Sequence, residues 1–338
     1  MGGERSQVCM LDGGGNIVLE KKIRTSEAGL KGILGKLPRC RVVLEAGAMA
    51  RWGSSFVESL GHEVKVVNAR KMRRIYENDS KSDVVDAREL ADAGLYRWDK
   101  LPTVKMRDVR VQENLAVLGT RDALVRARTA LVNTARSLLK EEGVRVAKCS
   151  VEAFASKAAP VVPDGLKMAV EPLLAEIASL TGRVKELDKW GLLAGEKDPA
   201  IKALQQVKGV GAVTAAAFVW TLDDPYRFAK SRAVGSYLGL RPKQDQSGET
   251  DKQMPITKAG NPFLRRLLVG CSQYILGPFG PDTALRRWGL KLAERGGKRA
   301  KRKAVVAVAR KLAVLLHHLW VTGEVYEPFP GHPMRQAA

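Results

Sequence analysis

The chain has 338 residues, 45% of them apolar and 28% charged, a composition typical of a folded globular protein. This length favours two or three domains over one. There are 57 Lys and Arg against 36 Asp and Glu, so the net charge is +21. Such an excess indicates a polyanionic partner, DNA or RNA. A basic protein without such a partner is the alternative, and an anionic membrane surface is a weaker one.

The sequence contains no signal for a membrane, for export or for zinc. No uninterrupted apolar run reaches the roughly 18–20 residues of a spanning helix, and residues 1–7 are too polar for a signal peptide. We therefore expect a cytoplasmic protein. His317 and His318 lie in an apolar stretch, which favours a structural role. The cysteines lack metal-binding spacing and are expected to be reduced: Cys9, Cys40, Cys149 and Cys271.

Strand-like and helix-like patterns alternate over the first 100 residues, which indicates an α/β domain. A glycine-rich break at residues 12–16 separates two strand patterns and predicts a hairpin. A short β-branched run stops at Ala46, so Glu45 is expected at the end of a strand. The expected strands are 5–11, 17–22, 41–45 and 62–67, and the expected helices are 56–60 and 83–95.

From about residue 105 to 195 the apolar residues recur in heptads, which predicts a coiled coil or a long helical hairpin. Proline and glycine break the pattern at residues 158–165, and Asp122 interrupts one seam. An intramolecular helix pair and a dimerisation arm both remain open. The main series are Val111, Leu118, Val125, Val132 and Leu139, and then Leu173, Ile177, Leu180, Val184 and Leu187.

The remainder of the chain is mainly helical, with glycine-rich junctions. We therefore predict three domains: an α/β domain over residues 1–102, a helical middle over 103–195, and a mainly α C-terminal domain over 196–338.

Two acidic residues lie three positions apart in the helix expected from Asp83. On a helix, Asp83 and Asp86 share one face, and with Glu45 they could converge at one edge of the α/β domain. Such hard oxygen ligands suit Mg²⁺ or Mn²⁺, which can assist phosphodiester displacement. The alternative is that both aspartates simply favour the dipole at a helix start.

A glycine-rich turn at residues 208–214 lies between apolar helical stretches and resembles a helix-hairpin-helix turn. Its glycines, Gly209 and Gly211, would let backbone N–H groups approach a phosphate beside Lys208. A tight structural turn is the alternative.

Ser247 lies in a polar stretch that is expected to be flexible, with Arg241 and Lys258 nearby in sequence and Arg265 and Arg266 following. A serine hydroxyl becomes a nucleophile when a base or metal removes its proton and cations hold the phosphate. A solvated loop serine is the alternative.

Residues 286–310 carry ten Lys or Arg and one acidic residue. Like charges at this density repel unless an anion neutralises them, so a phosphate backbone is expected beside them. A solvated basic helix is the alternative. Trp288 could stack on a base or belong to the core. The densest cations are Lys298, Arg299, Lys301 and Arg302.

Taken in order, these motifs resemble the DEDD transposases of bridge-RNA-guided insertion sequences, the IS-one-ten family. The resemblance covers nearly the whole chain. It rests on these anchors: 44–46, 81–88, 209–211, 238–242, 246–249, 257–261 and 264–266.

The resemblance implies an N-terminal RuvC-like domain of RNase H type, a coiled-coil middle and a C-terminal transposase domain. It implies that Glu45, Asp83 and Asp86 bind Mg²⁺ or Mn²⁺, and that Ser247 attacks the DNA phosphodiester. A structured guide RNA would select donor and target DNA. The two halves of the active site would come from different protomers, which implies a dimer or tetramer, without a membrane, associated with the bacterial nucleoid.

The chain departs from the family at its first strand. The family's first aspartate precedes the segment that matches residues 5–11, so its position falls ahead of Met1. Asp12 lies at the far end of the next strand, and Glu4 lies on the wrong side of the turn. This departure predicts a natural start further upstream or a degraded copy. The alternative functions are therefore an inactive copy that only binds nucleic acid, or a metal-dependent junction nuclease.

Overall fold

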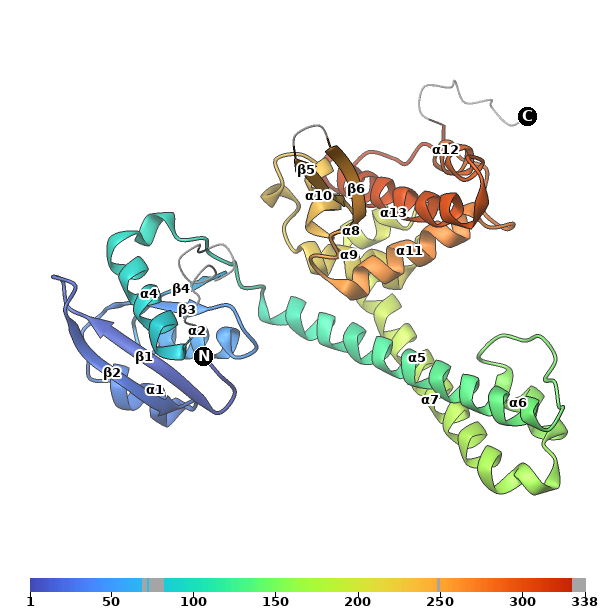
Figure 1. Ribbon diagram of the computed structural model, residues 1–338, viewed down its shortest axis with the longest axis horizontal. Coiled ribbons are helices and arrows are strands. Elements are labelled where there is room, and N and C mark those ends of the chain that lie inside the picture. The colour runs from blue at the N-terminus through green and yellow to red at the C-terminus, as the bar shows by residue number, and fades with distance from the viewer. Residues whose placement is uncertain (69–71, 73–81, 248–249, 330–338) are drawn as a thin grey trace. The chain divides into compact units, whose positions relative to one another are not determined.

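Figure 1 shows the computed structural model, which describes residues 1–68, 72, 82–247 and 250–329. For residues 245–247 and 250–253 it describes the backbone only. The chain folds into two compact units, Met1–Arg107 and Asp108–Ala338. The first corresponds closely to the predicted α/β domain. The predicted helical middle belongs to the second unit together with the C-terminal part.

The first unit begins with an antiparallel hairpin of β1 (Arg5–Leu11) and β2 (Ile17–Arg24), as the sequence predicts. Asp12 forms the turn, because its carboxylate accepts hydrogen bonds of 2.9 Å from the backbone N–H groups of Gly14 and Asn16. Hydrogen bonding from the Asn16 side chain, followed by these backbone bonds, lowers the pKa of Asp12. Asp12 is therefore fully engaged in the turn.

A second, parallel pair consists of β3 (Arg41–Glu45) and β4 (Glu63–Val67), joined through α2 (Ala50–Ser59). Leu44 and Val66 are buried on it. In the part of the chain that the structure describes, β1 and β2 form one sheet and β3 and β4 another. The predicted strands are thus confirmed, but they form two separate pairs.

Two helices flank these strands. α1 (Glu27–Leu34) begins at Ser26, whose hydroxyl accepts from the N–H of Gly29. α4 (Asp83–Tyr96) begins at Ser82, which caps it in the same way through Val85. The helix predicted from residue 83 is therefore confirmed.

α4 is tied to the hairpin by an ion pair. The Arg88 guanidinium donates two hydrogen bonds of 2.7 Å to the carboxylate of Glu20 on β2, and this lowers the pKa of Glu20. The pair fixes the helix that carries Asp83 and Asp86 against the first sheet.

The second unit contains a long antiparallel helix pair, α5 (Val109–Glu141) and α7 (Lys167–Glu196), with α6 (Phe154–Ala158) at its far end (Figure 1). Heptad residues such as Val132 and Ile177 are buried between these helices. The heptads thus pack within one chain. The break predicted at residues 158–165 separates α6 from α7 as two short 3₁₀ turns.

Polar side chains on α5 form hydrogen bonds and ion pairs with neighbouring elements at two positions along the helix. Arg128 is 5% exposed and donates to the hydroxyl of Thr181 at 3.2 Å and to the carboxylate of Glu152 at 3.1 Å. Asp122, the residue that interrupts the seam, bonds Arg126 at 3.0 Å and Arg266 at 2.5 Å. The interruption therefore has a structural reason, because Asp122 connects α5 to the helix that carries Arg266.

The rest of the second unit is a helical core with one hairpin, β5 (Pro242–Ser247) and β6 (Thr250–Ile256). α9 is buried over most of its length, as its apolar sequence requires. The core helices are α8 (Pro199–Leu204), α9 (Ala212–Leu222), α10 (Arg232–Tyr237), α11 (Pro262–Leu276), α12 (Ala284–Ala293) and α13 (Gly297–Thr322).

α13 is long and apolar enough to span a membrane by length and composition alone. Its residues Val308, Leu312 and Leu316 are nevertheless fully buried in the protein core, so it is a core helix. His317 on the same helix contacts Ser231 Oγ at 2.9 Å and the carbonyl oxygen of Pro225 at 2.8 Å. The structural role expected for His317 is thus confirmed.

Candidate functional site

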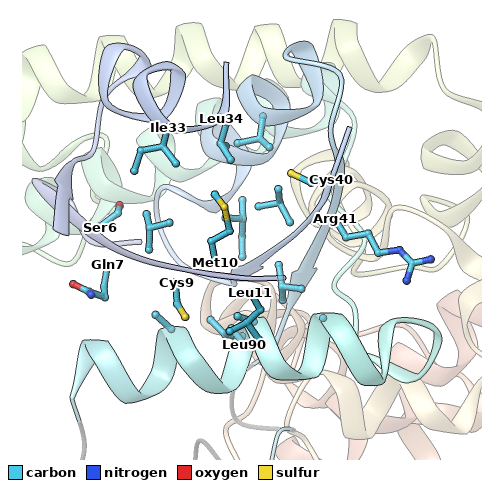
Figure 2. Close-up of a pocket in the computed structure, with 18 of the residues that line it drawn as sticks. Ser6, Gln7, Cys9, Met10, Leu11, Ile33, Leu34, Cys40, Arg41 and Leu90 are labelled. Carbon is cyan, nitrogen blue, oxygen red and sulfur yellow. The ribbon is translucent and has the colours of Figure 1, made fainter. Parts of the chain in front are cut away.

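The three predicted carboxylates line one cavity of about 640 Å³ in the first unit. Figure 2 shows other residues of its lining, among them Cys9, Leu34 and Leu90. Glu45 is the last residue of β3, Asp83 is the first residue of α4, and Asp86 lies one turn further along α4. Asp83 is exposed and the other two are partly buried. Residues nearly 40 positions apart therefore line the same cavity, and their convergence on one metal ion stays a prediction.

Carboxylate oxygens are the donors that Mg²⁺ prefers. Across the described ranges, however, no three acidic, histidine or cysteine side chains lie close enough together to hold a metal ion. The donor type therefore fits a divalent cation, whereas the present spacing does not form a three-residue ligand set. Lys81, the first residue of the predicted motif, lies outside the described residues.

Ser247 is the last residue of β5, where the β5–β6 hairpin reaches its turn. The sequence predicted a flexible loop here, and the structure has strands instead. The reason is that residues 243–253 are polar almost throughout, so the hairpin lacks the apolar alternation by which strands are predicted. The serine nevertheless belongs to the second unit and the carboxylates to the first.

Arg265 fastens the base of this hairpin. Its guanidinium donates to the carbonyl oxygens of Leu238 at 2.9 Å and Ala259 at 2.7 Å, which lie before β5 and after β6. Partial burial, followed by the charge of Arg266, lowers the pKa of Arg265. Arg265, predicted to bind nucleic acid, is thus engaged in an internal contact.

The two chain segments at the hairpin base approach so closely that only glycine fits. Gly260 has φ +71°, and a Cβ there would collide with the carbonyl of Tyr237. Gly239 has φ +68° and meets the backbone of Ala259 in the same way. Lys258 also has a positive φ, of 56°, with an exposed side chain. The two glycines therefore allow the close backbone contacts at the base of the hairpin whose first strand ends at Ser247.

The other cations near the hairpin differ in their availability. Arg266 forms an ion pair with Asp122, so its positive charge is already neutralised within the protein. Arg241 is exposed and donates to the side chain of Gln244 at 2.9 Å. Arg241 and Lys258 are therefore the more accessible of the predicted nucleic-acid contacts here.

The glycine-rich turn joins α8 to α9, so a helix-turn-helix arrangement surrounds it. Gly209 has φ +97°, and a Cβ there would press on Tyr274 and Ile275 at 3.0–3.1 Å. Gly211 caps α9 without a side-chain hydrogen bond, and Lys208 is exposed. The turn is structurally required, and its likeness to a helix-hairpin-helix motif stays a prediction.

The basic run occupies α12 and the start of α13. Four predicted contacts at that start are exposed, and no ion pair involves them among the described residues: Lys298, Arg299, Lys301 and Arg302. They lie at the positive end of the helix dipole, where cations destabilise the helix unless an anion is present. Trp288 packs against the core with Lys311 Nζ 4.4 Å from its ring centroid, so the core interpretation of Trp288 is confirmed.

Sequence reasoning missed two structural roles near these sites. Arg286 was counted in the basic run, but it donates to the carbonyl oxygens of Ile275 and Gly277 and holds α12 to α11. The hairpin clamp formed by Arg265 was also missed. The signal that could have found the clamp is the pair of glycines, Gly239 and Gly260, that flank the hairpin.

Two family descriptions match the chain. A DEDD transposase domain of IS110 type matches residues 1–143, and the transposase IS116/IS110/IS902 family matches residues 201–285. A putative transposase of Sinorhizobium fredii is 29% identical over 93% of this chain and 81% of its own length. The transposase for insertion sequence element IS1111A of Coxiella burnetii is 26% identical over 95% of this chain and 88% of its own length.

A probable family 20 transposase of Pseudomonas aeruginosa is 28% identical over 95% of both chains. The two matched regions carry the carboxylates and the serine hairpin respectively. The family resemblance seen in the sequence is therefore confirmed, and the chain belongs to the IS116/IS110/IS902 family of insertion-sequence transposases.

Proposed function

We propose that this transposase cleaves and exchanges DNA strands through Ser247, assisted by Mg²⁺ or Mn²⁺ at Glu45, Asp83 and Asp86, and guided by a structured RNA. The observation that supports the proposal is that Glu45, Asp83 and Asp86 all line one cavity, from the end of β3 and the first turn of α4. The matched family supports transposition itself, and the guide RNA rests on the resemblance of the motifs.

The serine step is a phosphoryl transfer. The Ser247 hydroxyl oxygen attacks phosphorus and forms a phosphodiester to the protein, the bond to one deoxyribose oxygen breaks, and the serine proton passes to a base. The released deoxyribose oxygen takes up a proton. Reversal of this step with a second DNA hydroxyl rejoins the strands. The rigid base held by Arg265 would keep the hairpin in one position during both steps.

A divalent cation bound at the carboxylates would stabilise charge on the phosphate. Glu45, Asp83 and Asp86 would hold it once they, or further oxygen ligands, come closer together than they are here. A homo-oligomer in which different protomers supply the two halves of the site is also part of the proposal, and it rests on the resemblance of the motifs to the family.

In this proposal the exposed lysine and arginine side chains bind the nucleic acid. At the start of α13, among the residues that the structure describes, no acidic partner pairs with Lys298, Arg299, Lys301 or Arg302. Lys208, Arg241 and Lys258 add exposed charge elsewhere. Phosphate would relieve both their mutual repulsion and their conflict with the helix dipole.

Ser247→Ala tests the serine. We expect loss of DNA joining by at least about 10³-fold with nucleic-acid affinity unchanged, because only the nucleophile is removed. The measurement is strand exchange with purified protein, flanking-element RNA, matched DNA and Mg²⁺. Ser236→Ala, at an exposed serine of the same unit, is the control and should retain full joining. Undiminished joining by Ser247→Ala would contradict the proposal.

Asp83→Ala and Asp86→Ala test the carboxylates. Each should remove the Mg²⁺-dependent activity while leaving RNA binding intact, because the lost oxygens are ligands and not phosphate contacts. Asp99→Ala, at an exposed aspartate of the same unit, should leave activity unchanged. Cleavage that persists in EDTA would rule out the metal part of the proposal.

One observation favours a second function. The described residues contain no three-residue metal ligand set, which is the state expected of a copy that binds nucleic acid without cutting it. Salt-sensitive binding to RNA or DNA without any strand cleavage would support this alternative.

A further inference from the structure

A loop of the second unit exposes an aromatic ring. The loop covers residues 223–231 and joins α9 to α10. Its Tyr226 is 75% exposed. Within the described part of the chain, the Tyr226 ring forms no aromatic or cation–π pair, and its hydroxyl forms no hydrogen bond. Both the face of the ring and its polar end are therefore open to a partner.

The backbone on both sides of this ring is fixed to one buried histidine. His317 is 1% exposed, and its two ring nitrogens lie 2.8 Å from the Pro225 carbonyl oxygen and 2.9 Å from Ser231 Oγ. The Asp224 carboxylate also accepts a hydrogen bond of 2.9 Å from the backbone N–H of Tyr226. An ordered backbone thus presents the exposed ring, which lowers the entropic cost of binding.

The other aromatic residue of the loop packs inward. Phe228 lies edge-on to Tyr237, with ring centroids 5.3 Å apart, and to His317 at 5.5 Å. The Arg227 guanidinium carbon covers the same two aromatic rings, 5.1 Å from Phe228 and 4.8 Å from Tyr237. These residues hold the loop on the core. Tyr226 is the aromatic side chain of the loop that faces solvent.

The surface around Tyr226 is basic. Lys230 and Arg232 are exposed, and they flank the serine that contacts the buried histidine. Arg310 of α13 extends this surface, because its Cγ lies 2.9 Å from the position of a Cβ on Gly235, one turn after Arg232. In the described part of the chain, none of these three cations forms an ion pair. A polyanion is therefore the complementary partner.

We propose that this loop binds single-stranded DNA, with one base stacked on the Tyr226 ring and the adjoining phosphates bound by Lys230 and Arg232. Every unpaired base offers a π-face to an exposed aromatic ring, and cations follow the backbone. A duplex keeps its base faces stacked inside, so the loop selects unpaired strands. α10 leads directly from this loop to the base of the β5–β6 hairpin. The choice of DNA as the occupant rests on the proposed strand exchange, which leaves strands transiently unpaired.

The test is binding and photocrosslinking of the full chain without guide RNA or metal. The probe is an oligothymidylate of about 15 nucleotides with one central 5-iodouracil. Irradiation should attach it to the peptide that contains Tyr226. Tyr226→Ala should weaken binding of the single strand at least about fivefold and leave binding of a duplex of equal length unchanged.

Two variants control for the ring itself. Tyr226→Phe keeps the stacking surface and should bind the oligothymidylate as the wild type does. Tyr96→Ala, at a tyrosine that is 63% exposed in the first unit, is the matched control and should also bind normally. Because the assay needs no catalysis, Ser247→Ala should bind normally too, so a failure of the serine chemistry and a failure of this proposal are seen separately.

The cations give a second measurement. Lys230→Gln and Arg232→Gln should each lower the slope of log affinity against log salt by about 0.7, the value for one phosphate contact to a single strand. An oligouridylate of the same length is the RNA arm. Tighter Tyr226-dependent binding of the oligouridylate would assign the loop to RNA and overturn the proposal. So would adducts confined to other peptides, or equal losses of single-strand and duplex binding in Tyr226→Ala.

Discussion

The two units of this transposase stabilise themselves in different ways. In the second unit a large helical core surrounds α9 and α13, and a second cluster lies among α5, α6 and α7, with many residues of both fully buried. In the first unit the apolar residues fall into three small clusters around two separate strand pairs and a cavity of about 640 Å³. The helical unit satisfies its backbone groups within each helix, whereas the α/β unit depends on pairing between strands. The unit that carries the carboxylates therefore has the smaller and more divided apolar core.

Matched leucine truncations should give the largest difference between the units. Leu312 in α13 is 0% exposed and Leu30 in α1 is 5% exposed, but only Leu30 borders the cavity. Leu312→Ala should destabilise its unit by about 2–5 kcal/mol, and Leu30→Ala should cost less because fewer contacts are lost. Hydrogen exchange of peptides from each unit, followed at increasing urea concentration, measures the loss of stability in both variants. An equal or larger loss at Leu30 would contradict the comparison.

Within the second unit, two glycines allow the cost of a crowded Cβ to be separated from the cost of a positive φ. Gly260 and Gly143 have nearly equal φ, +71° and +74°, but a Cβ at Gly260 would strike the Tyr237 backbone while Gly143 has open space. Both alanine variants share the left-handed backbone penalty, so Gly260→Ala should cost about 1–3 kcal/mol more than Gly143→Ala. The same exchange measurement decides this. Equal costs would mean that the hairpin base is not rigid.

The smallest expected effect concerns the cations of α13. Arg302→Gln should weaken binding to any nucleic-acid sequence and lower the slope of log affinity against log salt by about one, because one phosphate contact is lost. Lys185→Gln, at an exposed lysine of α7, is the control and should leave the slope unchanged. A slope that is the same for Arg302→Gln and wild type would remove α13 from the interface.

Local patterns predicted much of this structure. The turn at Asp12, the β-branched run that ends at Glu45 and the helical pattern that begins at Asp83 each specify their element within a few residues. The heptads likewise predicted the pair of α5 and α7. These predictions succeeded because side-chain periodicity and turn chemistry act over short stretches of chain.

Contacts between distant residues could not be predicted. Arg266 and Asp122 are 144 positions apart and Arg265 bonds two carbonyls, so counting cations in the sequence assigned both arginines to nucleic acid. The β5–β6 hairpin was missed because its polar residues carry no alternation. The cavity follows from the placement of two strand pairs, which no local pattern specifies.

The most direct test of the account is a search for DNA attached to the protein. The full chain is incubated with guide RNA, donor and target DNA and Mg²⁺, denatured, digested and analysed by mass spectrometry. The account predicts a nucleotide bound through phosphate to the peptide that contains Ser247, and no adduct from Ser247→Ala. DNA that is cut without any such adduct would contradict the account, because water would then be the nucleophile.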